Sequence, residues 1–272
     1  IKYRLLEVKV ADGSSEALAL HVNNLSDLLK INSKEGLQKY YVLTDIIDCS
    51  SIANFAPLGI VNGENLGFSG NFNGNSSNGY YLKNVKFNYN QSSNQEYNYG
   101  LFSLINEDAV VKNLKLEIKE LNISVINANT SNMYIGGIAV MNNGAIDSCE
   151  TVIKSSNIRS NTINMYVGAV TAFNSSTGKV LSSKASGNLN ITRKGGEKTA
   201  IGGLVGENQN LVQGNFNMFD STDKLSQILT NQDYDSSVAI FFKSEEQLKL
   251  VGFSVGGIVG LNTKTVQNVS SN

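Results

Sequence analysis

The sequence predicts an all-β protein, a right-handed parallel β-helix with three strands in each rung. Three observations lead to this fold class. A glycine-led pattern recurs along the chain, apolar and polar residues alternate around it, and long helical patterns are almost absent. A unit of three short strands cannot bury its own apolar face, but stacking it on similar units buries that face and pairs every strand.

The recurring pattern runs from an apolar residue and Gly through small and apolar residues to a closing Asn. A divergent first copy lies at 99–106, and clear copies lie at 135–142, 167–174, 201–208 and 255–262. Their glycines are 36, 32, 34 and 54 residues apart, at Gly100, Gly136, Gly168, Gly202 and Gly256. The long last interval predicts an insertion of about twenty residues, which we place within 220–249.

A second strand is expected after each copy, and a weaker third strand after three of them. The second strands lie at 109–116, 145–153, 179–185, 210–218 and 264–270, and the third strands at 121–126, 157–163 and 189–192. Glycine at the head of the first strand would allow a bend or a close backbone approach. We expect the closing Asn to adopt a left-handed corner conformation and to form a hydrogen-bonded ladder between rungs.

A short helix is predicted near the start of the chain, at 24–31. Leu25, Leu28 and Leu29 lie on one face, Asn24 is a suitable N-cap, and Gly36 follows the end. An exposed end rung invites edge-to-edge pairing, so we assign 1–38 to an N-terminal cap on one domain. Stacked rungs would occupy 39–219, and 250–272 would form a last, truncated rung. We expect further repeats or domains, or another chain, to cover that end.

Composition limits the classes of function. Hydrophobic residues make up 41% of the chain, enough for a sizeable core. The 22 basic and 23 acidic residues offer no net positive charge for nucleic acid. No apolar run reaches the length of a membrane span, so we expect no membrane insertion. The chain starts at Ile1 without a signal peptide, as a fragment or processed chain would.

The two cysteines, Cys49 and Cys149, are predicted to be separate buried thiols that act as small apolar residues. A disulfide between them stays open at this point, because the sequence cannot establish the geometry that a bridge needs.

The order of the motifs resembles that of proteins with the GLUG repeat. The run Gly202-Gly203-Leu204-Val205-Gly206-Glu207-Asn208 is similar to the motif itself, and Val111-Lys112-Asn113-Leu114 resembles the family's I-K-N-L strand. The likeness extends over 20–272 apart from the insertion. Phe72-Asn73-Gly74 lacks the aspartate that the family usually has there, and the family's Asp-Ile-Asp is stretched to Asp45-Ile46-Ile47-Asp48.

The resemblance implies a β-helix in a bacterial secreted or cell-surface protein. Such proteins include adhesin-like virulence proteins and the non-catalytic N-terminal region of IgA1-specific metallopeptidases. From it we expect an adhesin-like or scaffold module whose partner is a host or surface protein or a glycan. The alternative is an accessory β-helix that positions substrate for a large secreted peptidase. A full-length sequence containing His-Glu-x-x-His would favour that alternative.

No catalytic, cofactor-binding or metal-binding residues are predicted. His21 is the sole histidine and has no nucleophile motif beside it, so neither a triad nor a zinc set is supported. The glycine pattern opens a strand, whereas a dinucleotide fingerprint opens a helix. The acidic residues that a polysaccharide-degrading β-helix enzyme would need are scattered over different corners, at Glu107, Asp108, Asp147, Glu150 and Glu207. We therefore predict no enzyme activity in this chain and keep the polysaccharide-degrading enzyme as a weaker alternative.

Aromatic residues are the candidates for partner binding. One group lies before and within the first full rung, and the other lies in the insertion, because long loops on solenoids often carry function. Aromatic side chains are favoured at interfaces, although alternate members can equally pack inside the coil. The candidates are Tyr80, Tyr81, Tyr89, Tyr97, Tyr234, Phe241 and Phe242.

Overall fold

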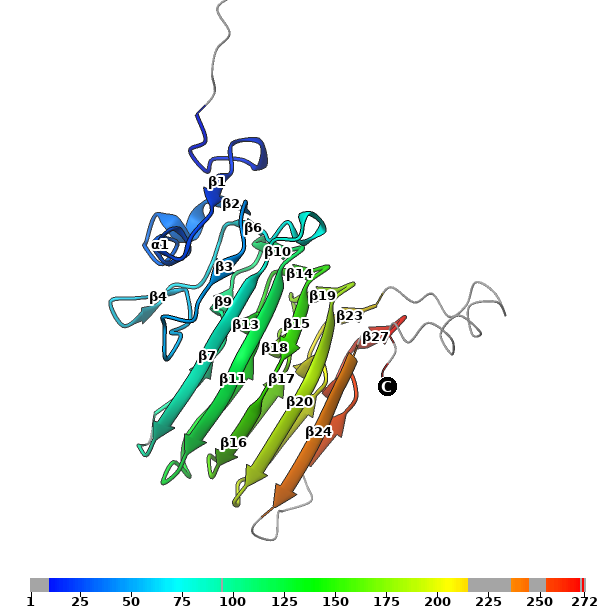
Figure 1. The fold of residues 1–272 in the computed structure, drawn as a ribbon. Helices are drawn as coiled ribbons and strands as arrows, with labels where there is room; N and C mark the ends of the chain where they lie inside the picture. The colour runs from blue at the N-terminus through cyan, green and yellow to red at the C-terminus, as the bar shows by residue number, and fades with distance from the viewer. Residues whose placement is uncertain (1–9, 94, 215–235, 245–252, 270, 272) are drawn as a thin grey trace, which may run out of the picture.

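Four parallel sheets, which we name A, B, C and E, wind around one core. The computed structural model describes residues 10–93, 95–214, 236–244, 253–269 and 271. From residue 97 onward the chain passes through sheets E, C, A and B in each rung and then enters sheet E one rung further along, whereas the earlier parallel strands belong to sheets A and B (Figure 1). This arrangement confirms the predicted all-β, parallel β-helix fold.

Each sheet is a stack that gains its strands rung by rung. Sheet A consists of β1 (Leu20–Val22), β2 (Tyr40–Leu43), β6 (Asn71–Asn73), β10 (Val110–Lys112), β14 (Ala145–Asp147), β19 (Lys179–Leu181), β23 (Leu211–Gln213) and β27 (Thr265–Gln267). Sheet B consists of β3 (Ile47–Asp48), β7 (Leu82–Gln91), β11 (Lys115–Val125), β15 (Glu150–Ile153), β16 (Ser156–Ser160), β20 (Lys184–Arg193) and β24 (Ser236–Ser244). Sheet C consists of β9 (Phe102–Ile105), β13 (Ala139–Asn142), β18 (Thr171–Asn174), β22 (Val205–Asn208) and β26 (Val259–Asn262). Sheet E consists of β8 (Tyr97–Tyr99), β12 (Asn132–Gly136), β17 (Asn164–Gly168), β21 (Lys198–Gly202) and β25 (Phe253–Gly256).

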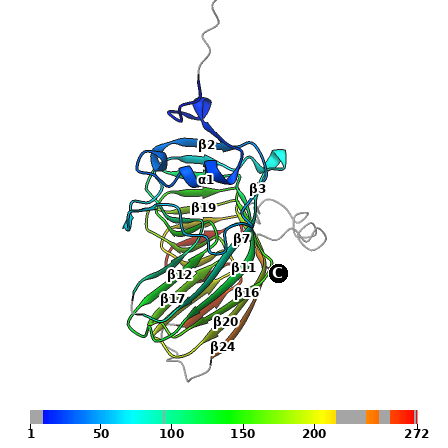
Figure 2. The same ribbon diagram turned by 60° about the vertical axis from the view of Figure 1, so that its left-hand side comes forward.

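The remaining described elements are short and lie near the N-terminal end of the stack. The predicted helix is α1 (Leu25–Lys30), and Asn24 caps it by accepting a hydrogen bond from the backbone N of Asp27 at 2.9 Å. Figure 2 shows α1 beside β2. Leu28 and Ile31 are buried in the same core as the rungs, as expected for a cap. The others are η1 (Glu16–Leu18), η2 (Gly36–Gln38), η3 (Ser76–Asn78) and the antiparallel pair β4 (Ile60–Val61) and β5 (Glu64–Asn65).

The predicted glycine anchors stack in register. Gly136 pairs with Gly168, Gly168 with Gly202, and Gly202 with Gly256. The divergent first copy shifts by one residue, because Ile105, and not Asn106, pairs with Asn142. Its bend therefore has one residue fewer than the bends of later copies.

The rung has four strands where three were expected, because the chain bends at the glycine pattern. A Cβ on Gly136 would collide with the carbonyl oxygen of Ala139 and the amide nitrogen of Ala172. Only glycine permits this close approach, so the expected first strand divides into one strand of sheet E and one of sheet C. The glycine ends a strand here and does not open one.

The left-handed corner lies elsewhere than expected. Positive φ angles occur at the turn from sheet A to sheet B, at Asn113, Ser148, Ser182 and Asn268. The Asn residues that close the strands of sheet C have no positive φ. The second expected strand is thus also divided, into a strand of sheet A and a strand of sheet B.

The closing Asn side chains form the predicted ladder, which we call the inner ladder: Asn142, Asn174, Asn208 and Asn262. Each Nδ2 donates to the Oδ1 of the next rung, at 2.7, 2.7 and 2.8 Å in order. The first three members are fully buried. A buried amide is stable only when it is hydrogen-bonded, so the ladder fixes these positions.

The expected insertion is shorter than 220–249. Residues 236–244 form β24, which pairs in parallel with β20 over its whole length. Alternation explains the strand, since Val238, Ile240 and Phe242 face the core while Phe241 is exposed. The sequence also favours short helices within the insertion, at 224–229 and 243–250. The second is wrong at its start, because Lys243 and Ser244 belong to β24, and 224–229 and 245–250 lie outside the described residues.

Both cysteines are buried and unbridged, as expected for separate apolar thiols. Burial raises the pKa of each thiol to about 12, so both stay protonated at neutral pH. None of the helices in the described ranges has the length and apolar character to cross a membrane.

Candidate ligand-binding site

Sheet B presents its outer surface along five long or paired strands. Beyond the irregular stretch between Leu116 and Glu120, where β7 and β11 shift in register, side chains alternate between the two faces of the sheet, as β geometry requires. Ile123, Ile158 and Ile191 are buried, while their neighbours Asn157 and Asn190 are exposed. Every second residue of the carboxyl halves of these strands therefore faces away from the core.

Two rows of outward side chains cross this half of sheet B in register. The first is the amide row, in which Asn88, Asn122, Asn157 and Asn190 occupy the same position on four successive rungs and Phe241 continues it. The second is the mixed row, two residues further along each strand: Asn90, Ser124, Arg159, Thr192 and Lys243. Neighbouring members are one strand spacing apart, about 4.8 Å.

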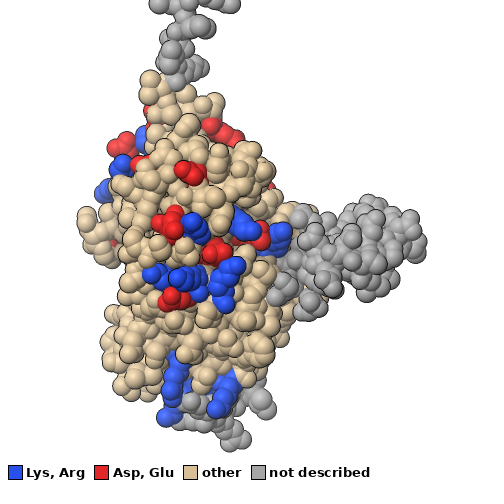
Figure 3. All heavy atoms as spheres, in the orientation of Figure 1, with Lys and Arg blue, Asp and Glu red and all other residues tan. Residues whose placement is uncertain are grey.

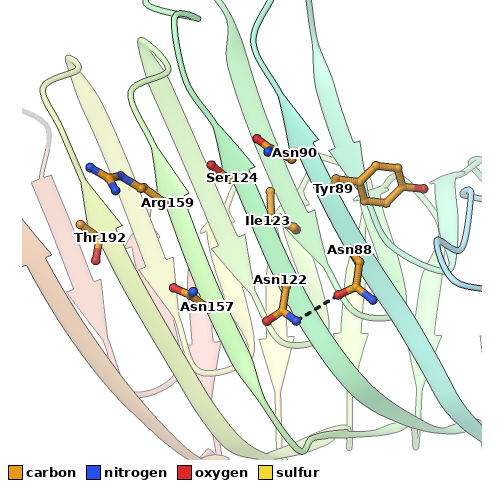
Figure 4. A pocket seen from close by; sticks show the side chains of 9 residues that line it. All are labelled: Asn88, Tyr89, Asn90, Asn122, Ile123, Ser124, Asn157, Arg159 and Thr192. Carbon is orange, nitrogen blue, oxygen red and sulfur yellow. Dashed lines mark hydrogen bonds between the residues drawn. The ribbon is translucent and has the colours of Figure 1, made fainter.

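Two open hollows follow these rows. One has a volume of about 490 Å³, and Figure 4 shows its lining, from Asn88 on β7 to Thr192 on β20. The other, of about 450 Å³, runs from Asn157 to Lys243 on β24. Asn157 and Thr192 line both, so the hollows form one shallow groove, which we call the sheet B groove.

Part of the amide row is held by hydrogen bonds. Asn122 Nδ2 donates to Asn88 Oδ1 at 3.0 Å, and Asn88 Nδ2 donates to Glu120 Oε2 at 2.9 Å. Asn190 Nδ2 donates to the carbonyl oxygen of Ser156 at 3.1 Å. Asn157, at the centre, makes no side-chain hydrogen bond to another described residue and is exposed. Its amide can therefore donate to and accept from a ligand.

The amino-terminal half of the same sheet has a different surface. Its charged side chains form ion pairs, namely Lys83–Asp48 at 3.5 Å, Lys115–Glu150 at 3.4 Å and Lys154–Glu117 at 3.3 Å. Figure 3 shows blue and red interleaved over the upper part of this face and blue alone over the lower part. The lining residues described for the groove include no Asp, Glu, His or Cys.

The predicted aromatic candidates do not form one patch. Tyr97 is only 1% exposed and belongs to the core, so its predicted role as a contact residue is wrong. Tyr89 is half-buried against Tyr99, with ring centroids 4.9 Å apart, and burial raises its pKa. Its hydroxyl donates to the carbonyl oxygen of Phe55 at 2.9 Å. Because side chains alternate along this part of β7, Tyr89 and Phe87 both point inward. This is the alternative stated from the sequence, in which alternate aromatic residues pack inside the coil.

The remaining aromatic candidates lie just before β7, on β24 and outside the described residues. Tyr80 and Tyr81 are half-buried just before β7, away from the groove, and Lys115 Nζ lies 6.0 Å from the Tyr81 ring centroid. Phe241 is 59% exposed and lines the groove, while Phe242 faces Phe253 with ring centroids 4.8 Å apart. Tyr234 lies outside the described residues. The structure thus brings Phe241 and the edge of Tyr89 to one groove, at opposite ends.

The amide row was missed from the sequence, although a signal was present. The third strands carry Asn at one outward position and a polar residue two positions later: Asn88/Asn90, Asn122/Ser124, Asn157/Arg159 and Asn190/Thr192. The Asn-x-Ser/Thr triplets at Asn122 and Asn190 are members of this series. Aligning the third strands by their buried isoleucines would have placed the outward residues side by side.

A second aromatic cluster lies outside the main core, between sheets E and C. Tyr134 and Tyr166 stack with ring centroids 4.8 Å apart and planes 5° apart. Lys198 Nζ lies 5.2 Å from the Tyr166 ring centroid and 2.6 Å from Glu207 Oε2. Tyr166 and Glu207 are buried, and burial raises the pKa of Tyr134 to about 12. These side chains contact one another, so we assign the cluster to packing.

The acidic candidates and His21 do not converge. His21 lies on the exposed side of β1, at the end of sheet A. Glu107 and Asp108 lie together at a hollow beside Lys179, while Glu150 pairs with Lys115 on sheet B. The described residues contain no group of three His, Cys, Asp or Glu side chains that could hold a metal ion.

The chain matches no protein-family model, no curated protein and no solved structure. A function must therefore be inferred from the residues of the sheet B groove. The resemblance to GLUG-repeat proteins stays a prediction.

Proposed function

We propose that the chain is a non-catalytic β-helix module that binds an extended glycan in the sheet B groove. The amide row carries the proposal, because it places four Asn side chains in register along an open groove. Each amide offers two donors and one acceptor oxygen, which suits the hydroxyl groups that cover a sugar.

The shape of the groove favours a polymer over a small molecule. Sites for small ligands usually enclose most of the ligand surface, whereas this groove is open and crosses five strands. Because the amides repeat at about 4.8 Å, a chain lying across the strands would meet the same group again at every rung. Phe241, at one end of the row, offers an exposed ring for the apolar face of a sugar.

The lining chemistry supports binding and not cleavage. Glycoside hydrolysis uses two carboxyl groups that flank the scissile bond. The described lining residues carry none, and Glu120, which accepts a hydrogen bond from Asn88, lines neither hollow. The polysaccharide-degrading enzyme therefore gains no support from this groove.

The setting of the module is part of the same proposal. A glycan-binding β-helix fits an adhesin-like or scaffold protein secreted by, or displayed on, a bacterial cell. A substrate-positioning role beside a secreted peptidase would use the same groove for a glycosylated substrate, and a His-Glu-x-x-His sequence in a longer chain would support it.

Binding to immobilised hexasaccharides, some uncharged and some carrying carboxylates or sulfates, tests the proposal. We compare the wild-type protein with Asn157→Ala and with the control Asn188→Ala. Asn188 is an exposed Asn of the same strand as Asn190, but it lies outside the groove lining. We expect at least one hexasaccharide to bind, and Asn157→Ala to weaken it about 3- to 10-fold, the effect of one or two hydrogen bonds.

Asn188→Ala should leave that binding unchanged. The proposal fails if no hexasaccharide binds, or if both variants weaken binding equally.

A further inference from the structure

The carboxyl half of sheet B is a regular platform for a ligand. Its strands keep one register from β7 through β11, β16 and β20 to β24, whereas the register shifts of β7 and β11 lie upstream, between Leu116 and Glu120. The outward side chains of this half therefore form unbroken rows from strand to strand. The row from Asn88 to Phe241 covers four strand spacings, about 19 Å.

The amide row and the mixed row are separated by residues that point into the core. Ile123, Ile158 and Ile191 lie between the two rows and are buried, and Figure 4 shows Asn122 and Ser124 on either side of Ile123. Outward residues two positions apart on a strand are about 6.6 Å apart. This separation is close to the width of a pyranose ring with its hydroxyl groups, so a ring lying flat over one strand reaches both rows.

The groove is shallow and open, so it contacts a ligand from one side. A ligand meets all five strands only if it is straight and presents a flat side to the sheet. Pyranoses joined through equatorial bonds, as in β-1,4-linked glucans and mannans, form such a ribbon, and each sugar advances it by a length similar to the strand spacing. An α-1,4-linked glucan curls into a helix, which turns away from a flat surface after a few sugars.

We infer that the ligand of the sheet B groove is an extended, equatorially linked glycan that lies along the stack with about one sugar on each strand. Its hydroxyls meet the amide row on one edge and Ser124 and Thr192 of the mixed row on the other, and Phe241 contacts a ring at the last strand. The inference rests on the proposed glycan-binding function and adds the linkage and the length of the ligand.

Saccharides that differ in linkage test the inference, with affinity measured by titration calorimetry. Cellohexaose and maltohexaose contain the same glucose units, joined β-1,4 in one and α-1,4 in the other. β-1,4-Mannohexaose and α-1,6-mannohexaose form a second pair. We expect the β-1,4 member of at least one pair to bind at least about 5-fold more tightly than its partner, the effect of about one further hydrogen bond. Its affinity should rise with each sugar from the trisaccharide to the hexasaccharide, as each sugar reaches another strand.

Two variants test whether the ligand spans the groove. Phe241 continues the row that contains Asn122, three strand spacings or about 14 Å away. Asn122→Ala and Phe241→Ala should each weaken binding of the β-1,4 hexasaccharide about 3- to 10-fold. The control Asn188→Ala, outside the groove lining, should leave it unchanged. A loss in only one of the two groove variants would place the ligand at one end of the groove and contradict the inference.

The outcomes separate this inference from the proposed function. If neither pair favours its β-1,4 member, the inference is overturned while glycan binding stands. Binding by none of these four saccharides, together with binding by another saccharide of the immobilised screen, has the same meaning. Absence of binding by every saccharide overturns both.

Discussion

Two sets of asparagines recur on successive rungs of this β-helix, and they differ in almost every physical respect. The inner ladder is buried, and each amide bonds to the next at 2.7–2.8 Å. The amide row lies on the outside of sheet B, where one hydrogen bond between its described members, from Asn122 Nδ2 to Asn88 Oδ1, joins two of them. The same residue type thus has two roles, set by which side of the coil it occupies.

The difference shows where the stability of the fold resides. A buried amide without a partner costs the full desolvation penalty of its polar atoms, whereas an exposed amide is satisfied by water. The inner ladder is therefore required by the coil. The amide row contributes less to folding, and Asn157, whose side chain makes no hydrogen bond to another described residue, keeps its donors and acceptor available for a ligand.

Breaking the inner ladder should have the largest effect on stability. Asn174 accepts from Asn142 and donates to Asn208 and to the carbonyl oxygen of Gly178 at 3.0 Å. Asn174→Ala removes these bonds in the middle of the stack, and we expect a loss of about 2–4 kcal/mol in the free energy of unfolding. Urea unfolding followed by circular dichroism measures it. A loss below about 0.5 kcal/mol would show that the ladder is dispensable.

A smaller effect is expected at Arg193, the inward counterpart of the exposed Arg159. Burial lowers the pKa of its guanidinium to about 10, and Nη2 donates to the carbonyl oxygens of Thr162 and Ile163 at 2.8 and 3.0 Å. Arg193→Met keeps the aliphatic volume and removes these donors, so we expect a loss of about 1–2 kcal/mol. Arg159→Met is the matched control, because the Arg159 side chain is exposed and interactions of exposed side chains contribute little to stability; we expect a loss below about 0.5 kcal/mol.

Thermal and urea unfolding of Arg193→Met and Arg159→Met measure the change in the free energy of unfolding for each variant. An Arg193→Met protein more stable than wild type would mean that burying the guanidinium costs more than its hydrogen bonds return.

The smallest effect on stability is expected in the amide row. Asn157→Ala removes an exposed side chain without a described hydrogen-bond partner, so unfolding free energy should stay within about 0.5 kcal/mol of wild type. The same urea titration checks it. A loss comparable to that of Asn174→Ala would show that Asn157 also stabilises the fold. The inner ladder and the amide row would then not differ in their contribution to stability.

The β-helix could be predicted because the residues that mark each repeat, a glycine and a closing Asn, lie within a few positions of each other. The stacking of Gly136, Gly168, Gly202 and Gly256 and the Asn ladder both follow from the pattern. The division of the rung into four strands was not predicted, because glycine was expected to open a strand, whereas the tight approach of Gly136 to the carbonyl oxygen of Ala139 makes it the end of one. The second close contact, with the amide nitrogen of Ala172, exists only after the rungs have stacked.

The groove was harder to predict for a related reason. Its neighbouring residues lie 33–35 positions apart from β7 to β20 and 51 apart from β20 to β24, and each looks like an ordinary exposed residue on its own strand. Only register places Arg159 beside Thr192 and Ser124. Aromatic density suggested Tyr97 instead, and alternation turned that side chain into the core. Strand 236–244 was similarly hidden, because the chain between β23 and β24 separates it from its rung.

The most direct test of the account is a side-chain amide NMR titration with a hexasaccharide that binds in the immobilised screen. The 1H–15N signals of Asn88, Asn122, Asn157 and Asn190 should shift with saccharide concentration, while those of Asn142, Asn174, Asn208 and Asn262 should stay in place. Variants at Asn157 and Asn174 assign one signal of each set. Shifts confined to residues outside the amide row, or no shift at saturating saccharide, would contradict the claim that this face binds the ligand.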